Sequence, residues 1–142
     1  MNFLFLDFET ETLEGPITEV CCIDSNDKSQ KFNSLEEFFN MFKGTKDKES
    51  INEDIFKDKV LVIWHIWHYE YLMKYHPEFL NYTIKSRILI FTNCYALYDG
   101  FTKSRYKIAE ITKELLGREH QGNALDDCKD LKDCFNMVNT VR

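Results

Sequence analysis

Apolar residues in this chain occur in short runs that polar or charged turns separate. The first run, residues 3–6, is uninterrupted and leads directly into Asp7, which is typical of a strand buried on both faces of a sheet. Further apolar stretches predict strands over 17–23, 29–32, 60–64 and 84–91. We expect the first three strands of the chain to form an antiparallel meander.

Apolar residues at helical spacing predict helices between and after these strands. Ser34 and Glu37 form a capping box, which marks the start of the first helix. Its apolar side is formed by Leu35, Phe38, Phe39 and Phe42. Further helices are expected over 66–76, from Ser104 to Leu116 with Gly117 as the stop, and over 123–138. The charged segment 44–54 is predicted to be a mobile loop. The element order βββαβαβαα predicts an α/β fold with helices packed against a mixed sheet.

Length and composition indicate one globular, intracellular domain. The 142 residues suffice for a proper core, and we expect a single domain over 1–142. No apolar run approaches the length that spans a bilayer, so no membrane association is expected. The N-terminal residues lack the basic segment of a signal peptide, which favours an intracellular protein. The five cysteines are odd in number and include no Cys-x-x-Cys pair, which indicates reduced thiols and no zinc site.

The charge balance limits the kind of nucleic-acid contact that the chain can make. A formal net charge of −6 argues against a broad basic platform for nucleic acid. The net charge is still compatible with a nuclease, because divalent ions bound to a carboxylate cluster cancel its negative charge locally.

Two carboxylates at the end of the first strand suggest a cation site. Asp7 and Glu9 are two positions apart, so both side chains point to the same side of the strand and repel each other. A hard divalent cation with oxygen ligands would relieve this repulsion. The alternative is a solvated strand end that continues into an acidic turn.

The last helix carries a third carboxylate. On a helical projection Asp127 lies about 60° from Ala124, at the edge of the buried stripe, whereas Asp126 points away into solvent. The alternative is that both acids only complement the positive N-terminus of the helix. We predict that Asp7, Glu9 and Asp127 converge on one site.

These motifs resemble those of a known enzyme superfamily. A strand ending Phe-x-Asp-x-Glu-Thr, a meander and a late helix reading Asn-Ala-Leu-Asp-Asp-Cys resemble the DEDD superfamily of 3′–5′ exonucleases, closest to its His branch. Residues 104–117 resemble the helix that precedes the last motif, and the similarity covers nearly the whole chain. The resemblance implies an RNase H-like fold and metal-dependent hydrolysis of phosphodiester bonds at single-stranded RNA or DNA 3′ ends.

In this superfamily four carboxylates bind two Mg²⁺ or Mn²⁺ ions, which activate a water and stabilise the leaving oxygen. Asp7 and Glu9 match the first motif and Asp127 matches the last acid. The middle motif departs from the pattern: His68 stands where an Asp is expected, and Glu70 has the right chemistry but faces about 160° from Leu72 on a helix. Either residue is therefore expected to complete the metal site.

The resemblance also implies a histidine that acts as general base. Its usual position, five residues before Asp127, is occupied by Gly122. His120 lies nearby, and a bend at Gly122 would let it reach the site. The alternative is an exposed loop histidine.

Contacts with a single-stranded 3′ end are assigned to four residues. Phe8, Trp67 and Tyr69 are assigned because aromatic rings stack on bases of any sequence. Thr10, from the Asp-x-Glu-Thr motif, is assigned with them. Core packing is the alternative for the aromatic residues. The altered middle motif and displaced histidine also permit a degenerate protein of this fold, which binds nucleic acid or a protein partner without cleavage.

Overall fold

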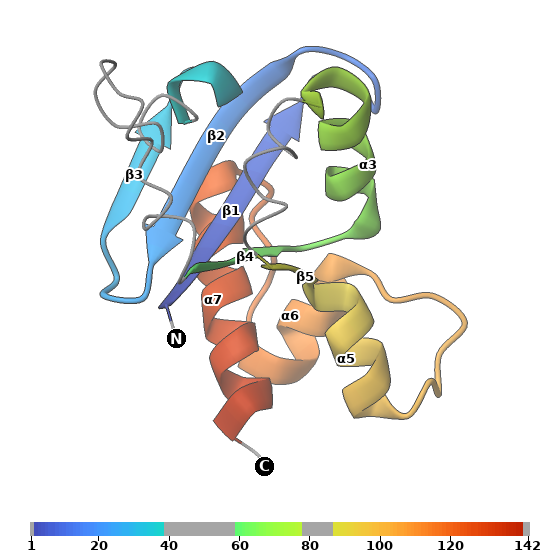
Figure 1. Cartoon of the computed structure of the whole chain (residues 1–142). Helices are drawn as coiled ribbons and strands as arrows, with labels where there is room; N and C mark the ends of the chain where they lie inside the picture. Colours follow the sequence, from blue (N-terminus) through green and yellow to red (C-terminus); the bar gives the residue numbers. More distant parts are fainter. Residues whose placement is uncertain (1, 39–58, 78–86, 141–142) are drawn as a thin grey trace.

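The computed structural model describes residues 2–38, 59–77 and 87–140, which form an α/β fold with a five-stranded mixed sheet flanked by helices (Figure 1). The strands are β1 (Asn2–Thr10), β2 (Ile17–Asp24), β3 (Ser29–Phe32), β4 (Lys59–Ile63) and β5 (Arg87–Ile90). Their order in the sheet is β3-β2-β1-β4-β5. β2 is antiparallel to β1 and β3, whereas β4 is parallel to β1 and β5. The predicted meander and the RNase H-like arrangement are confirmed.

Helices cover both faces of the sheet. They are α3 (Ile66–Tyr75), α5 (Phe91–Asp99), α6 (Ile108–Leu116) and α7 (Ala124–Thr140). On one face Leu4, Leu6 and Phe8 of β1 pack with Tyr71 and Leu72 of α3. The other face of the sheet packs against α5, α6 and α7, and α7 runs behind the strands in Figure 1. The expectation that β1 is buried on both faces is confirmed.

Alternation along β1 decides which side chains face α7. Leu4, Leu6 and Phe8 point toward α3, so the odd-numbered residues point to the opposite face, where Phe5 packs with α7. Asp7 belongs to this odd-numbered set, as does Glu9. The period-two pattern therefore directs the acids of the first motif toward the last helix.

Several predicted boundaries differ from the structure. The strand predicted over 84–91 ends at Ile90, and Phe91 begins a helix, α5, that the sequence pattern did not predict. Phe91, Thr92, Tyr95 and Ala96 are the buried residues of α5. They follow helical spacing, but the exposed Leu97 and Tyr98 lie outside this stripe, so apolar residues are not confined to one side of the helix. Residues 84–86 lie outside the described residues.

Serine caps were predicted at the starts of two helices. The helix placed at Ser104 begins at Ile108 with Lys107 as its cap, and no side chain caps it. One of the two bonds of the predicted capping box at Ser34 is present, because the Glu37 amide donates to Ser34 Oγ over 3.2 Å. The Glu37 carboxylate, however, accepts from the Asn33 amide rather than from Ser34. Phe39, Phe42 and segment 44–54 lie outside the described residues.

Candidate active site

The two acids of the first motif lie where β1 loses one of its neighbours. β4 pairs with β1 only from Asn2 to Phe5, whereas β2 continues to pair with it as far as Thr10. Asp7 and Glu9 therefore follow the last β1–β4 pair, on the side of the sheet that faces α7. The carboxyl ends of neighbouring parallel strands are the usual place for a ligand site in open α/β sheets.

Hydrogen bonds around the first turn of α7 fix the position of the third acid, Asp127. Asn123 caps the helix, because its Oδ1 accepts from the Asp126 amide over 2.9 Å and its Nδ2 donates to Asp126 Oδ2 over 2.7 Å. The carboxylate of Asp126 is thus bound to the capping residue Asn123. The Trp64 indole donates to the carbonyl of Asp127 over 2.8 Å, and the Cys128 thiol donates to the carbonyl of Phe5 over 3.1 Å. These bonds attach the start of α7 to the central strands.

The predicted convergence of the three acids is confirmed. Asp7, Glu9 and Asp127 each offer a carboxylate oxygen, and these oxygens lie within 4.8 Å of one another. Asp7 and Asp127 are buried, with 1% and 3% of their surface exposed. The alternative of a solvated strand end is therefore wrong for Asp7.

The electrostatics of the three acids favour a cation. Burial and the neighbouring charge of Asp127 raise the pKa of Asp7, and burial and the hydrogen bond with Asp127 raise the pKa of Glu9 to about 10. Burial also opposes ionisation of Asp127, but hydrogen bonds with His120 and Glu9 outweigh it and lower its pKa. Without a cation the cluster keeps protons, and a divalent ion would replace them.

The unused hydrogen-bonding capacity of the cluster also fits a metal. Asp7 Oδ2 is buried and has no hydrogen-bond partner among the described residues. A buried carboxylate oxygen without a partner is costly, and a metal ligand bond removes that cost. Three carboxylates form the oxygen-rich donor set that Mg²⁺ and Mn²⁺ prefer.

His120 reaches this cluster, as the sequence analysis expected. Gly122 has a φ of +83°, a left-handed conformation that favours glycine, and its amide donates to Asp127 Oδ1 over 3.1 Å. The bend places His120 Nε2 3.1 Å from the same Asp127 oxygen. This hydrogen bond raises the pKa of His120. The imidazole is 17% exposed, so the alternative of an exposed loop histidine is wrong.

The two candidates for the middle position occupy different environments. His68 is buried, and its Nε2 lies 3.3 Å from Asp7 Oδ1. Burial lowers the pKa of His68 to about 4, so the ring is neutral near neutral pH. Glu70 is exposed on the outer side of α3, because it lies two residues beyond His68. The expectation that Glu70 could complete the metal site is therefore wrong, and His68 contacts Asp7 instead of standing within the three-carboxylate group.

One assigned nucleic-acid contact is wrong. Phe8 has no exposed surface and packs in the core against Trp67, His68 and Tyr71, since even-numbered residues of β1 face α3. Trp67 and Tyr69 are partly buried and pack against the same core. Thr10 is partly buried, and its hydroxyl donates to the carbonyl of Thr12 over 2.5 Å.

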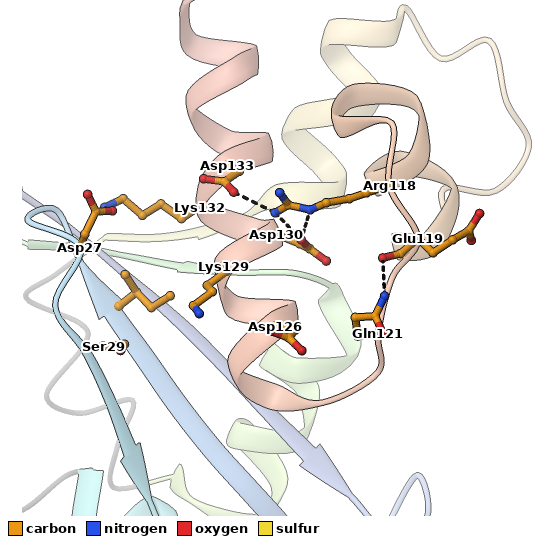
Figure 2. Close-up of a pocket in the computed structure, with 11 residues that line it drawn as sticks. Asp27, Ser29, Arg118, Glu119, Gln121, Asp126, Lys129, Asp130, Lys132 and Asp133 are labelled. Atoms are coloured by element: carbon orange, nitrogen blue, oxygen red, sulfur yellow. Dashed lines mark hydrogen bonds and ion pairs between the residues drawn. The ribbon is translucent and has the colours of Figure 1, made fainter.

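The sequence analysis missed an ion-pair group beside the three acids. Asp130 is buried on α7, one turn after Asp127, and Arg118 binds it through Nε and Nη2 at 2.8 and 2.5 Å. Arg118 Nη2 also lies 2.8 Å from Asp133, as Figure 2 shows. The signal was present, because Asp127, Asp130 and Leu131 follow helical spacing on the buried side of α7.

A cavity of about 580 Å³ borders this group, and Figure 2 shows the residues that line it. Residues of the β2–β3 turn, the 118–121 loop and α7 line it, and most of its charged side chains bind one another. Asp7, Glu9 and Asp127 do not line this cavity. It is therefore separate from the three-carboxylate site.

Comparison with models of known protein families and with curated proteins finds no match to this chain. Within the described residues, no helix combines the length and the apolar character needed to cross a membrane.

Proposed function

We propose that this protein is a metal-dependent 3′–5′ exonuclease that hydrolyses phosphodiester bonds at single-stranded RNA or DNA ends. The observation that carries the proposal is the meeting of Asp7, Glu9 and Asp127, from the two ends of the chain, in one group in which Asp7 and Asp127 are buried and Glu9 is partly buried. A purely structural role explains this poorly, because buried carboxylates that repel each other lower the stability of a fold.

The residues of the site would have different roles in this hydrolysis. Asp7, Glu9 and Asp127 would hold Mg²⁺ or Mn²⁺, which supplies Lewis-acid activation of water and stabilises the leaving oxygen. His120 lies at the edge of this group and would accept the proton of the attacking water at Nε2. His68, on α3, contacts Asp7 and would hold the orientation of that carboxylate. Trp67, Tyr69 and Thr10 would contact the terminal nucleotides.

A second candidate is a degenerate protein of the same fold that binds nucleic acid or a protein partner without cleavage. The observation that favours it is the replacement of the middle acid by a buried, neutral His68. One acid fewer lowers the charge available to bind a hard cation.

The experiment that separates the two candidates is cleavage of 5′-labelled single-stranded RNA and DNA oligonucleotides with Mg²⁺ or Mn²⁺. We expect a ladder of products shortened from the 3′ end that disappears with a chelator. An oligonucleotide blocked at its 3′ end is the substrate control and should stay intact. Binding without shortening under every metal condition would reject the exonuclease and favour the degenerate protein.

The middle position gives a prediction about metal preference. With His68 in place of an acid, we expect higher activity with Mn²⁺ than with Mg²⁺, because an acid fewer weakens binding of the harder ion. His68→Asp should raise Mg²⁺-dependent cleavage, measured as initial rates over a range of metal concentrations. Glu70→Gln, an exposed change on the same helix, is the control and should leave both rates unchanged. Loss of cleavage in Glu70→Gln with no change in His68→Asp would contradict this assignment.

A further inference from the structure

The imidazole of His120 lies between two aspartates of α7. Its Nε2 is 3.1 Å from Asp127 Oδ1, and its Nδ1 is 3.7 Å from Asp130 Oδ2. Both His120 Nδ1 and Asp130 Oδ2 are buried and have no hydrogen-bond partner among the described residues. A small rotation of either side chain would shorten 3.7 Å to a hydrogen bond. The side chain of Asp130 is 5% exposed, so water does not readily replace this contact.

From this geometry we propose that Asp130 is a positioning residue that keeps a proton on Nδ1 of His120. While Asp127 is ionised, its Oδ1 at 3.1 Å attracts a proton to Nε2. Once a cation took up the charge of Asp127, the proton on Nδ1 would leave Nε2 as the basic nitrogen that faces the three-carboxylate site. The imidazole of a general base needs this kind of orienting partner, because a neutral ring carries its proton on only one of its two nitrogens. The role in catalysis rests on the proposed nuclease function, whereas the position of the proton does not.

Asp127 competes with Asp130 for the same imidazole. When a cation binds the three-carboxylate group, the charge of Asp127 is drawn to that cation. Asp130 is then the one of these two carboxylates that still attracts the ring proton. A metal-bound site and an Nδ1 proton on His120 therefore favour each other.

Arg118 fixes which oxygen of Asp130 faces the histidine. Its Nε and Nη2 both bind Asp130 Oδ1 (Figure 2), and this leaves Oδ2 for His120. His120, Asp127 and Asp130 also have the spacing of a metal-binding group. Arg118 already supplies a positive charge to Asp130, which favours the positioning role over a second cation.

This arrangement makes the outcome of Asp130→Asn predictable. Arginine only donates, so the amide oxygen must face Arg118 and the amide NH₂ must face His120. The NH₂ group then donates to Nδ1 and drives the proton of the neutral ring to Nε2. Asp133→Asn is the matched control, because Asp133 binds the same Arg118 and carries the same charge but does not contact His120.

The test is ¹⁵N NMR of the histidine rings in the full chain, which has only four histidines. Spectra are recorded without metal and with saturating Mg²⁺, at a pH where the ring is neutral. The resonances of His120 are assigned as those that disappear in His120→Gln. We expect a protonated Nδ1 in the parent protein with Mg²⁺ and in Asp133→Asn. In Asp130→Asn we expect the Nδ1 resonance to move to the unprotonated range.

Two results would overturn the proposal. One is a His120 spectrum that Asp130→Asn leaves unchanged under both conditions, or that Asp133→Asn changes equally. The other needs no variant: a parent protein whose neutral His120 carries its proton only on Nε2 under both conditions.

Cleavage rates add a second readout. Asp130→Asn should lower kcat by about 100-fold to 10,000-fold, the share that a general base contributes, with little change in KM. Asp133→Asn should stay near the parent rate. If the parent protein does not cleave but the NMR result holds, the nuclease proposal fails and the positioning of His120 stands.

Discussion

Asp127→Asn is expected to abolish cleavage and, with it, the stabilisation of the fold by metal. The substitution keeps the size of the side chain but removes one of three charges that would hold the cation. A metal site contributes several kcal/mol to the transition state, so we expect a loss in kcat of about 1,000-fold or more. Thermal melting should also change, because a ligand at about 100 times its Kd stabilises the native state by about 2.7 kcal/mol.

Asp126→Asn is the matched control for this experiment. It makes the same change one residue away in the same helical turn, where Asp126 binds the capping Asn123. We expect this variant to keep both cleavage and the rise in melting temperature with millimolar Mn²⁺. A parent protein whose melting temperature does not respond to Mn²⁺, or equal losses in both variants, would contradict the assignment of Asp127.

Trp64→Ala is expected to give the largest loss of stability. Trp64 has no exposed surface, packs edge-on against Phe91 and His120, and donates to the carbonyl of Asp127. Removing a buried tryptophan costs about 3–5 kcal/mol, and loss of the hydrogen bond from its indole adds about 1 kcal/mol. That is a large part of the 5–15 kcal/mol typical of a domain.

The measurement is the free energy of unfolding from urea titration. Trp67→Ala is the control, because Trp67 is only partly buried and its indole donates no hydrogen bond to any residue that the structure describes. We expect a clearly smaller loss for this variant. A Trp64→Ala protein as stable as Trp67→Ala would show that the link between β4 and the start of α7 contributes little.

The sequence predicted the acid cluster because its parts follow strict periods. Asp7 and Glu9 share one side of a strand, and Asp127 borders the buried stripe of a helix. The local geometry of each element therefore predicted where these side chains point. The meander followed from apolar runs separated by short turns, and the mixed sheet followed from the order of strands and helices. Phe8 was misassigned as a base contact because its exposure depends on which face α3 covers, which periodicity alone does not decide.

Other features depend on contacts between distant segments. Asp130 and Arg118 come from a helix and from the loop before it, and their ion pair forms only when the chain bends at Gly122. α5 was missed because Leu97 and Tyr98 are apolar and exposed outside its buried stripe, so apolar spacing alone does not indicate a helix and packing on the sheet sets its helical state. His68 and Glu70 were left open because their helix could be placed in two registers, and the structure buries only His68.

The most direct test of the account is anomalous diffraction from crystals of the full chain soaked in Mn²⁺. The account predicts an anomalous peak within coordinating distance of Asp7, Glu9 and Asp127, and no such peak in crystals of Asp127→Asn. Well-ordered, Mn²⁺-soaked crystals in which these three carboxylates bind no ion would contradict it.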